Sequence, residues 1–195
     1  GNDTIAGGAG NDSIIGNAGN DSITSGAGSE DFQGNAGTDT FNFGADLDAN
    51  DTVNGGADSD TLIVTGAATG SGNVTAIETI QVNYTAAATF TTGAIAPGVA
   101  STITAAGSTA AVTIIASAYV PTTSLTIIDG QANDTITLAQ ADADRLITTV
   151  TLSTGGSDTI NLTNAAFNTG TDSHLTINNF QSGNAARSEE HTSEL

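Results

Sequence analysis

A nine-residue repeat at the start of the chain constrains its fold more than any other feature. The unit reads Gly-Gly-x-Gly-x-Asp-x-apolar-x and is clearest over residues 7–24. Its period holds over five units, which is not the behaviour of a flexible Gly/Asn-rich linker, and it predicts a solenoid. The acidic position falls on Asp3, Asp12, Asp21, Glu30 and Asp39. The apolar position falls on Ile5, Ile14, Ile23, Phe32 and Phe41.

Each unit divides into a turn and a strand. Glycine permits positive φ and close backbone approach, so the first six residues predict a tight turn. The last three residues, such as 13–15, predict a short strand with one side chain pointing inward. Two units form one coil, so Asp3, Asp21 and Asp39 share one edge and Asp12 and Glu30 share the other. Stacked carboxylates without basic partners repel each other, and a hard divalent cation with oxygen ligands, such as Ca²⁺, relieves that repulsion.

These residues resemble the RTX (repeats-in-toxin) calcium-binding family. The resemblance implies a right-handed parallel β-roll with each ion between the turns of units n and n+2. It gives candidate sites between Asp3 and Asp21, Asp12 and Glu30, and Asp21 and Asp39. The fourth unit departs from the pattern at Ser25 and Glu30, so we expect weaker ligands there. The residues expected to hold calcium are Asp3, Gly8, Gly10, Asp12, Asn17, Gly19, Asp21, Gly26, Gly28, Glu30, Gly37, Asp39, Asp51 and Asp60.

The segment 44–64 predicts an acidic loop followed by degenerate repeat units. Residues 46–51 begin like an EF-hand loop, but Asp51 stands where that loop needs Gly, and no Glu follows six residues later. Either Asp46, Asp48 and Asp51 form an additional cation site, or this is a solvated loop. The repeat then resumes, with Asp51 and Asp60 nine residues apart after a three-residue insertion.

Residues 65–183 predict a wider and irregular β-solenoid. Short Thr/Val/Ile runs with period-2 alternation indicate strands, and residues 139–145 are the one candidate for a turn of helix. Roll-like turns recur at 130–136 and 155–160, where Asp134 and Asp158 lie 24 residues apart. The expected strands are Thr61–Thr65, Val74–Asn83, Ala88–Thr92, Ser101–Ala105, Ala111–Ile115, Ser124–Ile128, Asp134–Leu138, Leu146–Leu152, Asp158–Leu162 and His174–Asn179.

Composition excludes several classes of partner. The chain has 21 acidic residues against two basic ones, a net charge of −19, so it lacks the cationic side chains that nucleic acids or an anionic membrane surface require. Cysteine is absent, which excludes disulfides, thiol catalysis and thiolate zinc sites. Threonine-rich segments at Thr89, Thr91, Thr102 and Thr104 suggest ice binding as a function, but no Thr-x-Thr ladder recurs at a fixed period.

No catalytic constellation can be assembled from the sequence, so we expect a protein that is not an enzyme. There is no Gly-x-Ser-x-Gly elbow, no His-Glu-x-x-His and no phosphate loop with Lys. Carboxylate pairs of the kind that glycosidases use are abundant, but they fall at repeat positions that calcium explains.

Residues 61–183 also resemble parts of large RTX-containing bacterial surface proteins, including S-layer proteins and giant adhesins, on the phrases at 74–82 and 175–183. The resemblance implies an extracellular, calcium-folded structural segment exported by type I secretion. Two alternatives stay open: the repeat region of a secreted protease, lipase or epimerase, and an adhesin solenoid that binds glycans or neighbouring surface subunits.

The chain ends are expected to be incomplete. It opens in mid-unit at Gly1, so we expect the native protein to begin earlier. Residues 187–195 resemble a translated sequencing adapter, so we expect them to be non-native. The sequence therefore predicts a β-roll over 1–43, an acidic loop with degenerate units over 44–64, a solenoid over 65–183 and a disordered tail over 184–195.

Overall fold

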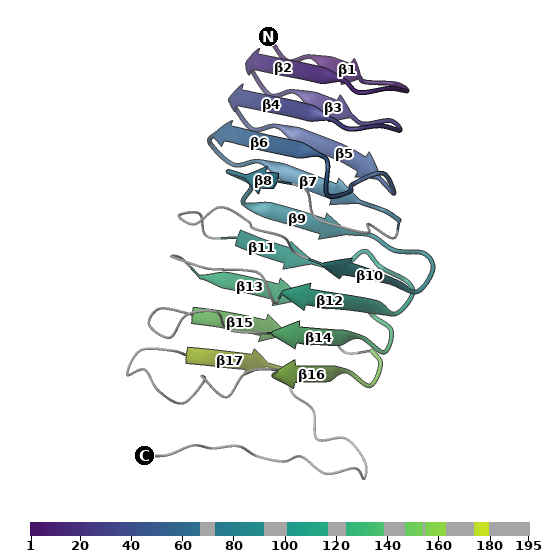
Figure 1. Ribbon diagram of the computed structural model, residues 1–195. Coiled ribbons are helices and arrows are strands. Elements are labelled where there is room, and N and C mark those ends of the chain that lie inside the picture. The colour runs from purple at the N-terminus through teal and green to yellow at the C-terminus, as the bar shows by residue number, and fades with distance from the viewer. Residues whose placement is uncertain are drawn as a thin grey trace.

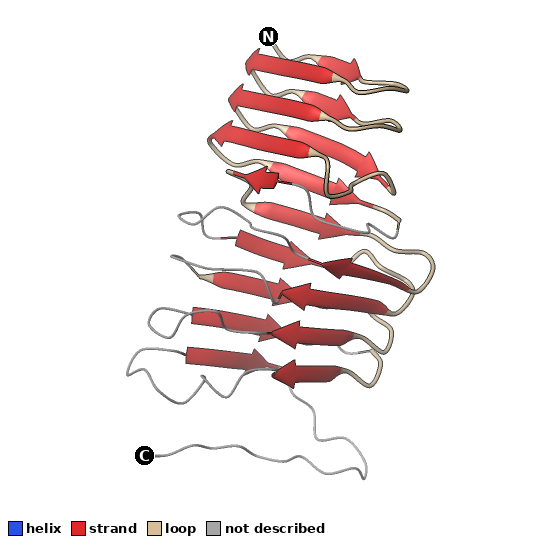
Figure 2. Cartoon of the chain, viewed as in Figure 1, coloured by secondary structure: helices blue, strands red, loops and turns tan. Residues whose placement is uncertain are grey.

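The protein is a parallel β-solenoid in which the chain passes back and forth between facing sheets. The computed structural model describes residues 1–66, 73–91, 101–116, 124–138, 147–153, 155–162 and 174–179. Strands stack coil upon coil from β1 near the N-terminus to β17, as Figure 1 shows. Over the described residues every element is a strand, a turn or a loop (Figure 2). The predicted all-β solenoid is confirmed.

One nine-stranded parallel sheet runs the length of the stack. Each of its strands pairs with the strand two further along the chain, as a solenoid requires. Its strands in spatial order are β1 (Thr4–Ala6), β3 (Ser22–Thr24), β5 (Thr40–Gly44), β7 (Thr61–Val64), β9 (Thr79–Val82), β11 (Ser101–Thr104), β13 (Leu125–Ile128), β15 (Ile147–Thr151) and β17 (His174–Asn178).

Two four-stranded parallel sheets form the return strands of the coils. The first contains β2 (Ser13–Ala18), β4 (Asp31–Ala36), β6 (Thr52–Ala57) and β8 (Asn73–Thr75). The second contains β10 (Ala88–Thr91), β12 (Val112–Ala116), β14 (Thr135–Leu138) and β16 (Thr159–Leu162).

Coil length grows along the chain. Thr4 pairs with Ser22, 18 residues on, whereas Thr40 pairs with Thr61, 21 residues on. A register shift between Asn42 and Gly44 marks the predicted insertion, and Leu47 in the following loop is buried. Further on, Thr102 pairs with Thr126 and Ala88 with Val112, both 24 residues apart. The predicted widening of the roll into a larger solenoid is confirmed.

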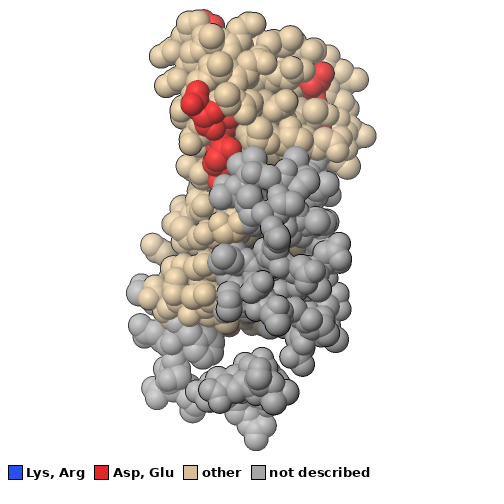
Figure 3. Space-filling view, turned by 90° about the vertical axis from the view of Figure 1, so that its left-hand side faces the viewer, with Lys and Arg blue, Asp and Glu red and all other residues tan. Residues whose placement is uncertain are grey.

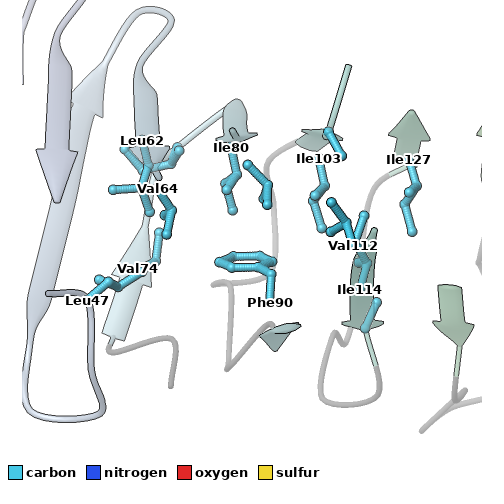
Figure 4. Packing of buried hydrophobic residues seen from close by; sticks show 14 of the residues in the cluster. Leu47, Leu62, Val64, Val74, Ile80, Phe90, Ile103, Val112, Ile114 and Ile127 are labelled. Carbon is cyan, nitrogen blue, oxygen red and sulfur yellow. The ribbon is translucent and has the colours of Figure 1, made fainter. Parts of the chain in front are cut away.

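The core is a single column of apolar side chains between the facing sheets. In the narrow coils a three-residue strand such as β3 buries only its middle residue, Ile23. In the wide coils β12 buries Val112, Ile114 and Ala116, at alternate positions as a strand dictates. Figure 4 shows residues of opposite sheets, such as Ile80 and Phe90, facing each other across this column.

One predicted strand, Val74–Asn83, is wrong as a single element. It is two strands, β8 and β9, in different sheets, joined by a turn in which Ala76 has a φ of 51°. The alternating pattern hid the turn because Val74, Ile77 and Ile80 all point into the core. The other nine predicted strands coincide with observed ones, apart from their terminal residues. The expected helical turn at 139–145 lies outside the described residues.

A row of hydroxyl residues crosses the nine-stranded sheet from end to end. Its members pair in register and none is fully buried among those whose side chains are described. Cross-strand threonine pairs of this kind stabilise a sheet by roughly 0.2–1 kcal/mol each. The residue spacing along the row varies from 18 to 27, which is why no fixed period is visible in the sequence. The row is Thr4, Ser22, Thr40, Thr61, Thr79, Thr102, Thr126, Thr149 and Thr176.

The nine-stranded sheet runs through all three predicted segments, 1–43, 44–64 and 65–183. The boundaries between these segments stay predictions. Residues 184–195, including the adapter-like 187–195, lie outside the described part of the chain. Among the residues that are described, there is no helix long and apolar enough to cross a membrane.

Candidate calcium sites

A column of five acidic residues, the first carboxylate column, runs along the edge at which the strands of the nine-stranded sheet begin. Each carboxylate after Asp3 accepts a hydrogen bond from the backbone N–H of the acidic residue one coil earlier. Asp3 donates to Asp21 at 2.7 Å, and Asp21 donates to Asp39 at 2.8 Å. The pattern continues from Asp39 to Asp60 at 2.8 Å and from Asp60 to Glu78 at 2.7 Å. The predicted stacking of Asp3, Asp21 and Asp39 is therefore present.

A second carboxylate column, formed by Asp12, Glu30 and Asp51, lies where β2, β4 and β6 begin. The N–H of Glu30 donates to Asp51 Oδ1 at 2.9 Å. Asp12 is joined to the next coil through its backbone carbonyl, which accepts the N–H of Asp31 at 2.9 Å. The predicted pairing of Asp12 with Glu30 on one edge is present, and Asp51 extends it.

Several carboxylate oxygens in these columns are buried without a partner. The Oδ1 atoms of Asp21, Asp39 and Asp60 are hydrogen-bonded, but their Oδ2 atoms have no donor. The same holds for Asp12 Oδ2 and both carboxylate oxygens of Glu30. Asp39 is 0% exposed and Asp21 and Glu30 are 2% exposed. Burying an unpaired carboxylate costs several kcal/mol, so these oxygens need a positive partner.

Within the described residues, no basic side chain provides that partner. The chain's two arginines, Arg145 and Arg187, lie outside the described residues, and there is no Lys. Within the described residues the one ion pair joins the N-terminal amine to Asp3 at 4.0 Å. Acidic side chains visible on the side shown in Figure 3 gather over the N-terminal coils. The columns are thus concentrated, uncompensated negative charge.

In four units a glycine at the first position, Gly7, Gly16, Gly34 or Gly55, makes room for the partnerless oxygen of the unit's aspartate. A Cβ on Gly34 would contact the carboxylate of Asp39 and lie 2.6 Å from the carbonyl oxygen of Gly55. A Cβ on Gly16 would likewise contact Asp21 and lie 3.0 Å from the carbonyl oxygen of Gly34. Carboxylate and carbonyl oxygens therefore converge beside these glycines, and this mixed oxygen set suits a hard cation such as Ca²⁺.

The second and third glycines of the units shape the turns. Gly8, Gly10, Gly19, Gly28 and Gly37 all have positive φ. Where the second glycine is replaced, Asn17 adopts a φ of 75°, which asparagine tolerates better than most residues. A Cβ on Gly26, Gly28 or Gly37 would contact the carbonyl group of Gly8, Gly10 or Gly19 one coil earlier. The turns therefore stack with their carbonyl groups close to the next coil.

Asparagine side chains also join successive turns, but here the accepting oxygen lies on the earlier coil and the donor on the later one. Asn2 Oδ1 accepts the N–H of Asn20 at 2.8 Å, and Asn20 Oδ1 accepts that of Thr38 at 3.0 Å. Asn11 does the same for Ser29 at 3.1 Å. Each coil is thus joined to the next by a neutral side chain, which leaves the adjacent carboxylates available to a ligand.

Burial raises the pKa values of three column carboxylates. It raises the pKa of Asp60 to about 6, and it raises that of Asp39 as well. The pKa of Glu30 rises to about 7 through burial and then the nearby carboxylate of Asp51. In each case the environment disfavours the negative charge that the sequence places there, unless a cation is present.

The structure bears on one alternative that the sequence analysis left open, and it adds one residue. The acidic loop at 46–51 folds on itself, because Asp51 Oδ2 accepts the N–H of Asp48 at 2.7 Å while Oδ1 belongs to the second column. Its three acids do not form a group of three converging ligand atoms. Glu78, which we did not predict, caps the first column; its one sequence signal is its position 18 residues after Asp60.

The fold and these edges define a class of protein: a parallel β-solenoid with stacked acidic turns that suit calcium. The family model described as the RTX calcium-binding nonapeptide repeat (4 copies) matches residues 1–29 and 47–62. These matched residues, fewer than half of the chain, are therefore similar to RTX calcium-binding repeats. Searches of curated proteins and of solved structures found no match.

Proposed function

We propose that calcium ions lie between successive acidic turns of both columns and hold the N-terminal coils together. The observation that carries this is the set of buried, partnerless oxygens on Asp12, Asp21, Glu30, Asp39 and Asp60. Asp3 and Asp51 would complete the two columns at their ends. Backbone groups of the turns at Gly8, Gly10, Asn17, Gly19, Gly26, Gly28 and Gly37 would complete the oxygen ligand sets.

Calcium binding then acts as a folding switch. Without calcium the stacked carboxylates repel each other, and burying them is unfavourable. At roughly millimolar calcium and a dissociation constant of ~10⁻⁴ M, each site adds about 1.4 kcal/mol to the stability of the folded chain. Several sites in one stack therefore turn ion binding into folding free energy.

This switch fits a structural, non-catalytic segment of a secreted bacterial cell-surface protein of the S-layer type. In a calcium-poor cytosol the acidic chain stays unfolded and competent for export by type I secretion. Outside the cell, millimolar calcium folds it. The net charge of −19, the absence of cysteine and the rigid stacked sheets support this role.

Circular dichroism of the full chain tests the switch. At neutral pH, coil signal in chelator should convert to β signal as calcium chloride is added. An Asp21→Asn/Asp39→Asn double variant should need several-fold more calcium, and Asp31→Asn, which removes an exposed charge on β4, should behave like wild type. Unchanged spectra with and without chelator would refute the switch.

A further inference from the structure

A third group of acids lies far from the two columns, in the wide coils. Ligand oxygens of Asp129, Asp134 and Asp158, the distal acidic cluster, lie within 4.8 Å of one another. Asp129 is 1% and Asp134 2% exposed, and Asp158 is half-buried. The cluster falls outside the residues that the family model matches, 1–29 and 47–62.

The fold brings these residues together from two coils. Asp129 directly follows β13, Asp134 directly precedes β14, and Asp158 directly precedes β16 in the next coil. The N–H of Asp134 donates to Asp158 Oδ1 at 3.0 Å. An asparagine contact repeats here too, since Asn133 Oδ1 accepts the N–H of Ser157 at 2.8 Å. The turns therefore stack as in the roll, but across 24 residues.

Asp129 distinguishes this cluster from the columns. In the roll each turn contributes one acid, whereas here Asp129 adds a second from the other end of the same turn. Its Oδ1 accepts the N–H of Ser153, but its Oδ2 is buried and has no hydrogen-bond partner. By contrast, both oxygens of Asp134 accept backbone hydrogen bonds, from Val112 and from Gly130, each at 2.7 Å.

We propose that the distal acidic cluster binds one divalent cation, of which Ca²⁺ is the best fit. Three converging carboxylates with no Lys or Arg among the described residues attract a dication, and the partnerless Asp129 Oδ2 is the oxygen left for it. All three ligand groups are hard oxygen donors, which favours calcium over the softer metals that histidine or cysteine would hold. The ion joins both ends of one turn to the next coil.

The site is independent of the RTX roll, so it is tested separately in the full chain. The number of bound ions is measured by equilibrium dialysis against calcium chloride for wild type, Asp129→Asn and the control Asp31→Asn. The amide oxygen that the Asp129→Asn change introduces can still accept the N–H of Ser153. We expect Asp129→Asn to bind one ion fewer than the other two. An equal number in all three proteins would overturn the proposal.

Hydrogen exchange locates the effect and covers the case in which Asp129→Asn fails to fold. In wild type, calcium should slow exchange in 124–138 by at least about tenfold. Asp158→Asn, at the half-buried member, should weaken that effect while the calcium response of 19–43 stays as in wild type. Equal protection of 124–138 with and without calcium in wild type contradicts the distal site, whatever 19–43 does. A calcium response confined to 124–138 would contradict the roll sites alone.

Discussion

The narrow coils of residues 1–66 and the wide coils of residues 101–138 differ in what holds each coil against the next. A narrow strand such as β3 buries one apolar side chain, whereas β12 buries three. Burying one large apolar side chain contributes about 1.5–3 kcal/mol, so β12 gains more from its core than β3, and β5 and β7, with two buried apolar side chains each, lie between them. The narrow coils instead bury partnerless carboxylate oxygens on Asp12, Asp21, Glu30, Asp39 and Asp60.

At one turn of the wide coils a neutral residue, Ser108, makes the contact between coils that a carboxylate makes in the narrow coils. Ser108 is 1% exposed, accepts the N–H of Tyr84 at 2.9 Å and donates to the carbonyl of Val82 at 2.6 Å. Its hydroxyl is fully satisfied without an ion. The comparison indicates that the ions proposed for the roll would compensate for the few buried side chains of the narrowest coils, whereas the contact at Ser108 needs no ion.

The largest expected effect tests the thin core directly. Phe32 is 0% exposed and its ring centroid lies 5.4 Å from that of Phe43. Phe32→Ala should cost about 3–5 kcal/mol in saturating calcium, because few other apolar groups can fill the space. Ile114→Ala in β12, which has buried neighbours on its own strand, should cost less, about 2–4 kcal/mol. Denaturant unfolding measures both; a larger loss at Ile114 would reverse the comparison.

The second prediction concerns the glycine that makes room for a carboxylate. Gly34→Ala should cost about 3 kcal/mol and raise the calcium midpoint, because the new methyl group would displace the Asp39 carboxylate. Gly44→Ala is the matched control: its added Cβ would meet only Thr65 Oγ1, at an ordinary 3.8 Å, and only its φ of 59° is unfavourable, at about 1–2 kcal/mol. Equal calcium midpoints for the two variants would show that Gly34 has no part in ion binding.

The third prediction is a reversal of pH dependence by calcium. Because the pKa of Glu30 is raised to about 7 and that of Asp60 to about 6, the folded chain in chelator binds more protons than the unfolded chain. Its stability should therefore fall as pH rises from about 4 to about 7, by roughly 1.4 kcal/mol per unit of pKa shift. In saturating calcium, stability should rise with pH, because protons compete for the ligands.

Glu30→Gln isolates one group in that experiment. The variant should lose part of the pH dependence seen in chelator, while Asp31→Asn should retain it, because Asp31 is exposed. Thermal unfolding at a series of pH values measures both. A wild-type chain that becomes more stable toward neutral pH in chelator would contradict the raised pKa values of the buried carboxylates.

The smallest expected effect lies at Asp58, which occupies a glycine position with a φ of 79°. Asp58→Gly should stabilise the chain by about 1 kcal/mol, because it relieves the backbone and removes a charge near Asp60. Asp58→Asn removes the charge and keeps the side chain, so it should give only part of the gain. If the two variants are equally stable, the backbone contributes nothing at this turn.

The sequence was sufficient for most of the fold because its signals are local. Fixed glycine and acid positions predict the turns, and single inward residues such as Phe41 predict the strands. The stacking of Asp3, Asp21 and Asp39 follows from the period alone. Nine of the ten strands expected beyond residue 60 were found on alternation and turn residues.

What the sequence could not show depends on coil length. The threonine row aligns residues at unequal spacings, so no periodic pattern marks it. In the distal acidic cluster the roll-like turns mark Asp134 and Asp158, but no pattern marks Asp129 as their partner. Asp129 in particular sits at the end of a strand rather than at a repeat position. The turn at Ala76 was missed because apolar residues on both sides of it point inward.

Amide exchange at Asp21 and Asp39, measured by NMR with calcium and with chelator, tests the central claim most directly. Each amide donates to a column carboxylate at 2.8 Å, so it reports on the contact that calcium is proposed to hold. We predict exchange at least about 100-fold slower in calcium, with near-coil rates in chelator. Equal protection of both amides in chelator would contradict a calcium-held roll.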